Sequence, residues 1–376
     1  DLQAPVDGYG NNVGDLLLTG TGTPNIINIT SDIGQTHPLN SFTIDAPQSA
    51  TTQTVNDFFG GQVTVTNNNA ISLNSNITVN NDIDMRNAGI MVNFGNGKSI
   101  TSLKGNFYTS VSTSQDGRNP SGFTIAGGSI YLPNGFLFLN SDINYQAYGQ
   151  PQIISTAKGI NLNGHNINAP VPINIYSDLI GPGNLILGAD GTVLKGNAGT
   201  ADTNLTGILF NGNGITFTVD ATDAPRDIYA PIVSNGANTI SITGGNVIFF
   251  TNVGDSTTGL GTINLANHHI LGFTSTLGNI DVYSEITTST TNTGKLLTSG
   301  PNEIRFHNDI GVGGKPLKEF NVTAITVMRN ANSKFAGTFI DGGGLLTLTP
   351  DGSEMFYHGT IDGMTAENYG GLAISG

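Results

Sequence analysis

Short runs of alternating apolar and polar residues follow one another along the whole chain. In the run at 62–85, apolar residues fall two positions apart at Ile71 and Leu73 and again at Ile77 and Val79. A period of two places such residues on one face of a strand, with Thr, Asn and Ser on the other face. Gly and Asn bound each run, as they do at tight turns. The pattern therefore predicts many short β-strands.

Paired apolar positions also recur at a loose interval. Steps of 23, 17, 24 and 16 residues separate five such pairs, Ile240/Ile242, Ile263/Leu265, Ile280/Val282, Ile304/Phe306 and Phe320/Val322. Two of these segments, IDVYSEI and IRFHNDI, share an ending as well. Self-similarity at about 20 to 50 residues is typical of solenoids. We predict an all-β protein, an irregular right-handed parallel β-helix whose coils stack on one another. A β-sandwich, which also has short strands with frequent turns, is the alternative.

The distribution of Glu and Lys supports an all-β fold. The first Glu is Glu285, and only four Lys residues precede Lys295. Because both residue types are favoured on helix surfaces, most of the chain has little from which to build solvated helices. All five Glu and six of the 13 basic residues lie from residue 285 onward. We expect one elongated solenoid over residues 1–376, with a distinct C-terminal section from about residue 285.

Charge and hydropathy limit the classes of partner that the protein is expected to bind. The net charge of −14 disfavours a nucleic-acid partner, whose phosphates need clustered Lys and Arg. No apolar run is long enough to cross a bilayer as a helix, so no transmembrane segment is expected. The chain has no Cys, which excludes disulfides and thiolate metal ligands. An acidic, cysteine-free chain rich in Asn, Thr and Gly is typical of bacterial surface proteins.

The segment DIGVGGKPLK at 309–318 looks at first like a phosphate-binding loop. A P-loop, however, requires Ser or Thr after the Lys and a helix after the loop. Here Pro316 follows Lys315, and the next residues read as a strand. We therefore predict a turn between coils in which the glycines adopt positive φ angles.

The densest acidic cluster is Asp220, Asp223 and Asp227, with Arg226 among them. Its functional interpretation is a calcium or sugar site, because carboxylates are the oxygen ligands that calcium takes. Its structural interpretation is a solvated excursion over 220–231 with Asp at turn positions. Calcium is the candidate ion, and no catalytic or cofactor-binding residue is assigned.

Aromatic side chains are the second kind of candidate, because exposed aromatic rings often mediate contact with ligands and partners. The chain has no Trp, so its ten Tyr residues are the ones to consider. Tyr145 and Tyr148 lie in the polar segment NYQAYG. We expect these two to be exposed and available to a ligand.

A recurring motif in the region from about 240 to 350 comprises Ile304, Phe306, Asp309, Ile310, Gly311, Pro316, Leu317 and Phe320. At these positions the region resembles the passenger repeats of bacterial autotransporters, above all rickettsial surface antigens of the outer membrane protein B type. The motif is structural and carries no catalytic residues. The resemblance implies a β-helix displayed on the bacterial cell surface, where family members act as adhesins or as a crystalline surface layer. No C-terminal membrane barrel is evident, so the chain would be a cleaved or truncated passenger.

These observations favour a non-enzymatic extracellular surface protein, in which a rigid β-helical rod assembles with itself or contacts a host. The expected partners are further copies of the chain, in a lattice or filament, and a host receptor or glycan. Two alternatives stay open. One is a β-helical polysaccharide lyase or hydrolase, which would need two or three carboxylates facing one cleft. The other is a viral or phage fibre or spike.

Overall fold

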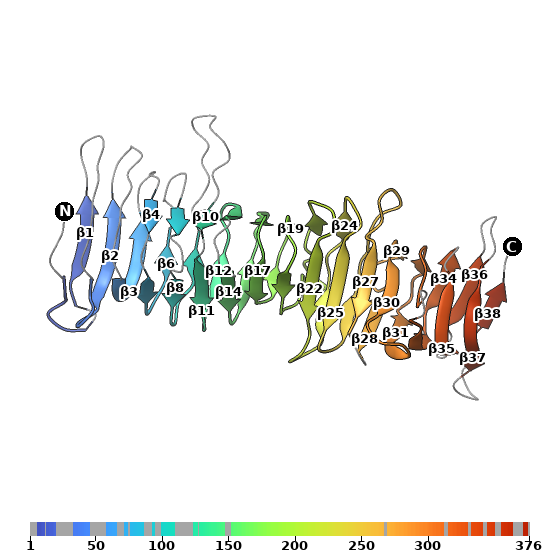
Figure 1. Ribbon diagram of the computed structural model, residues 1–376. Helices are drawn as coiled ribbons and strands as arrows, with labels where there is room; N and C mark the ends of the chain where they lie inside the picture. The colour runs from blue at the N-terminus through green and yellow to red at the C-terminus, as the bar shows by residue number, and fades with distance from the viewer. Residues whose placement is uncertain are drawn as a thin grey trace. The chain divides into compact units, whose positions relative to one another are not determined.

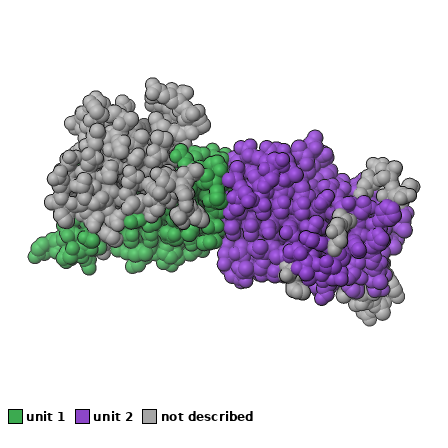
Figure 2. All heavy atoms as spheres, in the orientation of Figure 1, with its two compact units in different colours: residues 1–185 green, residues 186–376 purple. Residues whose placement is uncertain are grey.

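The chain is built from β-strands that stack in parallel. The computed structural model describes residues 6–11, 13–19, 33–45, 58–65, 71–73, 76–85, 92–94, 99–109, 123–126, 128–146, 152–266, 269–311, 315–329, 332–340, 344–349, 355–363 and 371–374. Every regular element among them is a strand. The chain divides into two compact units, residues 1–185 and 186–376 (Figure 2). Within each unit, strands pair in parallel with strands of the next coil (Figure 1), so the predicted parallel β-solenoid is confirmed.

Unit 1 opens with three long strands and continues with coils of three short ones. The opening strands are β1 (Asp15–Thr19), β2 (Leu39–Asp45) and β3 (Phe58–Val65). The first half of β3 pairs with β5 and its second half with β6, so one side of the solenoid becomes two.

Three ladders make up the rest of unit 1. The first contains β5 (Ile77–Val79), β8 (Ser99–Ser102), β11 (Ser129–Leu132), β14 (Gln152–Thr156) and β17 (Ile173–Tyr176). The second contains β6 (Ile83–Asp84), β9 (Phe107–Tyr108), β12 (Phe136–Phe138), β15 (Gly159–Asn161) and β18 (Leu179–Ile180). The third contains β4 (Ile71–Leu73), β7 (Val92–Phe94), β10 (Phe123–Ala126), β13 (Ile143–Gln146) and β16 (Ile167–Ala169).

Stacked aliphatic side chains form the core of unit 1. The parallel register of the first ladder places one isoleucine of each coil directly over the next, namely Ile77, Ile100, Ile130, Ile154 and Ile175. Each is at most 2% exposed. β-Branched side chains suit this arrangement because they are stiff about χ1 and pack well on a pleated surface. The period-two pattern of the sequence thus becomes a column of apolar contacts.

Unit 2 also has three sides, and β19 (Asn184–Leu187) spans the boundary between the units in the chain. The first side contains β20 (Thr192–Leu194), β22 (Thr216–Asp220), β25 (Thr239–Thr243), β27 (Thr262–Leu265) and β30 (Glu285–Thr288). The second contains β23 (Arg226–Ile228), β26 (Val247–Phe249), β28 (Ile270–Thr274), β31 (Thr293–Ser299), β33 (Leu317–Val322), β35 (Ser333–Ile340) and β37 (Tyr357–Gly363). The third contains β21 (Gly207–Phe210), β24 (Ile232–Ser234), β29 (Ile280–Val282), β32 (Ile304–Phe306), β34 (Ile325–Arg329), β36 (Leu345–Thr349) and β38 (Gly371–Ile374).

Aromatic rings fill the interior of unit 2 in addition to aliphatic side chains. Phe249 and Phe273 stack with centroids 5.7 Å apart, and Phe320 stacks on Phe335 at 4.9 Å. Phe306 joins the two pairs edge-on, at 5.4 Å from Phe273 and 6.2 Å from Phe320. Such pairs contribute roughly 0.5–1.5 kcal/mol beyond their buried area. The coils are therefore linked along the interior by one continuous set of rings.

The structure explains the irregular steps of the sequence repeat. The steps of 23 and 24 residues are true coils, because Ile240 pairs with Ile263 and Ile280 pairs with Ile304. The steps of 17 and 16 residues instead connect strands on different sides. IDVYSEI and IRFHNDI lie directly over one another, and the first side continues through residue 285 by pairing Thr262 with Glu285.

Candidate functional site

The acidic cluster lies at a corner of unit 2. Asp220 ends β22, and the chain turns over residues 221–225 before Arg226 begins β23. The expected excursion over 220–231 is therefore wrong, because Asp220 and residues 226–228 belong to strands and only the short corner 221–225 separates them. Buried Arg226 holds the corner together: its Nε donates to the Asp220 carbonyl oxygen at 3.0 Å, and its guanidinium forms an ion pair with Asp223.

The three carboxylates have different surroundings. Burial acts to raise the pKa of Asp220, but hydrogen bonds from Thr222 and the charges of Lys195 and Arg226 outweigh it, so the pKa lies below its ordinary value. For Asp227, burial raises the pKa. The structure describes no group of three or more His, Asp or Glu side chains arranged to hold a metal ion. Calcium binding by Asp220, Asp223 and Asp227 stays a prediction.

Asn and Asp side chains perform a repeated structural task at the corners of both units. In each case the Oδ1 atom accepts a backbone N–H from the next coil, at 2.8–3.3 Å. A backbone N–H that lies at a corner has no ladder partner, so the side chain supplies one. The acceptors include Asn76, Asp82, Asn106, Asp142, Asn166, Asp190, Asn197, Asn246, Asn252, Asn279, Asp309 and Asn332.

A second repeated element is a corner loop of the form Asn/Asp, apolar residue, Gly, five residues, Leu. It occurs three times in unit 2, beginning at Asn197, Asn252 and Asp309. Each glycine has a positive φ (80°, 76° and 66°), and the apolar residue before it forms isolated parallel bridges with neighbouring coils. The closing residues Leu205, Leu260 and Leu317 are buried in the core. Sequence reasoning missed this repeat because its copies lie far apart in the chain and share only four positions.

DIGVGGKPLK is the third copy of this loop. Ile310 bridges Ile286 and Ser333, and a Cβ on Gly311 would lie 2.3 Å from the Lys334 carbonyl oxygen. Lys315 is exposed, and β33 begins at Leu317. The predicted turn between coils is confirmed for the described residues, while residues 312–314 lie outside them.

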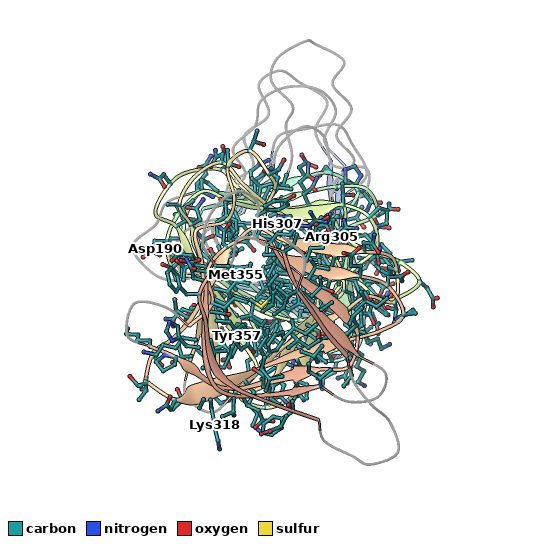
Figure 3. All side chains as sticks on the ribbon, turned by 90° about the vertical axis from the view of Figure 1, so that its right-hand side faces the viewer. Asp190, Arg305, His307, Lys318, Met355 and Tyr357 are labelled. Atoms are coloured by element: carbon teal, nitrogen blue, oxygen red, sulfur yellow. The ribbon has the colours of Figure 1, made fainter. Side chains whose placement is uncertain are left out.

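A charged cluster lies on the third side of unit 2, at β29 and β32. His307 Nε2 lies 2.9 Å from Asp281 Oδ1, and the His307 ring stacks on Tyr283 of the coil before, with centroids 4.0 Å apart. Arg305, which lies beside His307 in Figure 3, donates from Nη2 to Glu303 Oε2 at 2.7 Å. The Glu303 hydrogen bond, together with Asp281, raises the pKa of Arg305. The contacts of His307 with Asp281 and Tyr283 join neighbouring coils from the outside, whereas the Arg305–Glu303 bond lies within one coil.

The expected exposure of Tyr145 is wrong. Tyr145 belongs to β13, and its side chain points into the core, where it is 1% exposed. Burial raises the pKa of its hydroxyl well above the ordinary value. Because its neighbours in the sequence are polar, Tyr145 looked like a loop residue. It occupies an inward-facing position of a strand and pairs with Ile125 of the neighbouring coil. Tyr148 lies outside the described residues.

No known family model, curated protein or solved structure matches the chain. The resemblance to autotransporter passengers therefore stays a prediction. In the part of the chain that the structure describes, no helix is long and apolar enough to cross a membrane.

Proposed function

We propose that this protein is a non-enzymatic extracellular surface protein of bacteria, similar to an autotransporter passenger, that acts as a stiff β-solenoid scaffold. Its work would be contact: with further copies of itself in a layer or filament, or with a host receptor or glycan. The observation that carries the proposal is the use of polar side chains to join one coil to the next.

Carboxylates show this use most clearly. Asp82, Asp142, Asp190 and Asp309 each accept a backbone N–H from the following coil. Glu319 forms an ion pair with Lys295 of the coil before, at 2.8 Å. Such bonds reduce the freedom of the corners, where a solenoid has no ladder hydrogen bonds.

The hydrolase alternative would employ carboxylates differently. Glycoside hydrolysis uses two carboxyl groups that flank one bond and face substrate. In the acidic corner, Asp223 is neutralised by Arg226, and the Asp220 carboxylate accepts the Thr222 N–H at 2.9 Å. The same functional groups therefore serve the scaffold. The fibre alternative shares this scaffold and differs in oligomeric state.

The test is negative-stain electron microscopy of the purified chain, with and without calcium, beside a glycan-cleavage assay on the same samples. Ordered sheets or filaments support the assembly role, and isolated particles that bind a glycan array support the adhesive one. Cleavage of a glycan that Asp227→Asn abolishes, with the fold intact, would overturn the proposal. A trimeric mass would favour the fibre.

A further inference from the structure

We propose that a hydroxyl-rich face on the first side of unit 2 is the surface by which one copy of the chain contacts a second copy. The face is the outward side of β22, β25 and β27. We call it the hydroxyl grid and define it by two columns of three residues, Thr216, Thr239 and Thr262 beside Thr218, Ser241 and Asn264. The inference rests on the proposed function and names the contact surface that it requires.

The register of three strands produces the grid. Thr216 pairs with Thr239 and Thr239 with Thr262, while Thr218, Ser241 and Asn264 pair in the same way. Alternate residues such as Phe217, Ile240 and Ile263 point inward and are fully buried. Neighbouring coils are about 4.8 Å apart, and alternate residues of a strand about 6.6 Å apart. Short polar side chains are thus held in two regular rows by the packed core beneath them.

The side-chain hydroxyl and amide groups of the grid have no protein partner in the described structure, and all six residues are partly exposed. This distinguishes them from the corner Asn and Asp residues, whose side chains bond to the next coil. Their backbones pair in the ladder, but their side-chain polar groups make no hydrogen bond to a neighbouring coil in the described structure. Thr is also stiff about χ1, so ordering these side chains at an interface costs little rotamer entropy.

Charge argues for a second copy as the occupant. The chain has a net charge of −14, and like charge opposes self-association. The grid is uncharged, and the described carboxylates beside it lie at its border: Asp190, whose Oδ1 accepts the Thr216 N–H at 2.8 Å, Asp220 at the end of β22, and Glu285 in the coil after Thr262. An uncharged area allows two acidic molecules to approach.

Hydrogen-bond chemistry also favours a second copy of the chain as the partner of the grid. A hydroxyl both donates and accepts, and so does a primary amide, whereas a carboxylate only accepts and an ammonium only donates. A face of hydroxyls is therefore complementary to itself when two copies meet about a two-fold axis. Stacked sheets pack about 10 Å apart, a separation that short side chains from both faces can fill.

The size of the grid sets the expected strength. Three strands at about 4.8 Å spacing and about 15 Å length give roughly 200 Å² per copy. A standard stable interface has roughly 800 Å² per partner. One contact of this kind therefore gives a weak, closed dimer, and a layer would need a second contact surface on each copy. The assay must use high protein concentration.

The experiment is sedimentation velocity of the full chain over a concentration series, comparing wild type with Ser241→Lys and Ser241→Glu. Ser241 lies in the middle row, so each variant brings like charges together across a two-fold contact. We expect self-association to weaken on the order of tenfold for each variant alone. An equimolar mixture of the two variants should recover association, because opposite charges then meet. Thr347→Lys, a partly exposed outward position on the third side, is the matched control and should leave association unchanged.

Each outcome is decisive. If wild type associates and the two Ser241 variants associate equally well, the grid is not the contact, although self-assembly stands. If both variants lose association and their mixture does not recover it, the face does not meet itself. If wild type stays monomeric at every concentration, both this inference and the assembly part of the proposed function fail. Unchanged urea midpoints for the variants would show that the fold is intact.

Discussion

Ile240 tests the view that stacked apolar columns hold the coils together. Its side chain is fully buried in β25, between Phe217 of the coil before and Ile263 of the coil after. Ile240→Val removes one methylene group and should cost about 1 kcal/mol of unfolding free energy. Ile240→Ala leaves a larger cavity between two coils and should cost about 3 kcal/mol. Ser241→Ala in the same strand changes an outward position and should stay within about 0.5 kcal/mol.

The distribution of the effect is as informative as its size. In a solenoid each coil contacts only its neighbours, so destabilisation should be local. Amide hydrogen exchange of Ile240→Ala should therefore accelerate in β22, β25 and β27 by about a hundredfold, the equivalent of about 3 kcal/mol. Strands of unit 1 such as β14 should keep their wild-type rates. Chemical denaturation supplies the total free energy, and exchange followed by mass spectrometry supplies the location.

Two results would contradict this reasoning. Equal losses for Ile240→Ala and Ser241→Ala would mean that the inward column is not the source of stability. A uniform rise of exchange in every strand would mean that the coils unfold as one cooperative body rather than as neighbours.

Three further predictions concern the corners and a partly buried tyrosine. Asn252→Ala removes the acceptor of the Asp281 N–H, 2.9 Å away, and should cost roughly 0.5–1.5 kcal/mol in urea unfolding, whereas an effect near zero would contradict the corner role. Gly254→Ala should destabilise more than Gly214→Ala, because both have positive φ but only the first Cβ would meet a carbonyl oxygen, at 2.8 Å; equal thermal midpoints would contradict this. Burial raises the pKa of Tyr357 to about 12 from an ordinary 10.0, so its stabilising contribution is complete below pH 10 and is lost as the pH rises from 10 to 12; in a spectrophotometric titration Tyr357→Phe should reduce the late-titrating absorbance by one tyrosine, while the late signal of buried Tyr145 stays.

Sequence reasoning succeeds where one physical rule decides the outcome. Period two determines which residues of a strand point inward, so alternation alone identifies Ile240/Ile242 and Ile263/Leu265 as inward-facing pairs, and the structure stacks their two strands. The lack of Glu before residue 285 likewise agrees with the absence of helices from the described residues.

The roles of polar residues at the corners cannot be predicted from the sequence by such a rule. A polar residue at a corner can face solvent or cap the next coil, and the choice depends on a partner 18 to 30 residues away in the chain. Asp223 is a different case: its partner Arg226 is only three residues away, but its role depends on the burial of that arginine, which the sequence does not show. Tyr145 shows the reverse case, in which polar neighbours concealed an inward position.

The three Asn/Asp–apolar–Gly loops have a consequence for how this protein can diverge. Each loop follows an isolated bridge, at Ala198, Val253 or Ile310, and precedes a buried Leu, with residues 312–314 of the third loop outside the described residues. Loop length between these two anchored points does not affect strand register, and closing a longer loop costs only slightly more entropy. Evolution could therefore change the exposed exterior while the core stays constant. The same positions are suitable for peptide display by insertion.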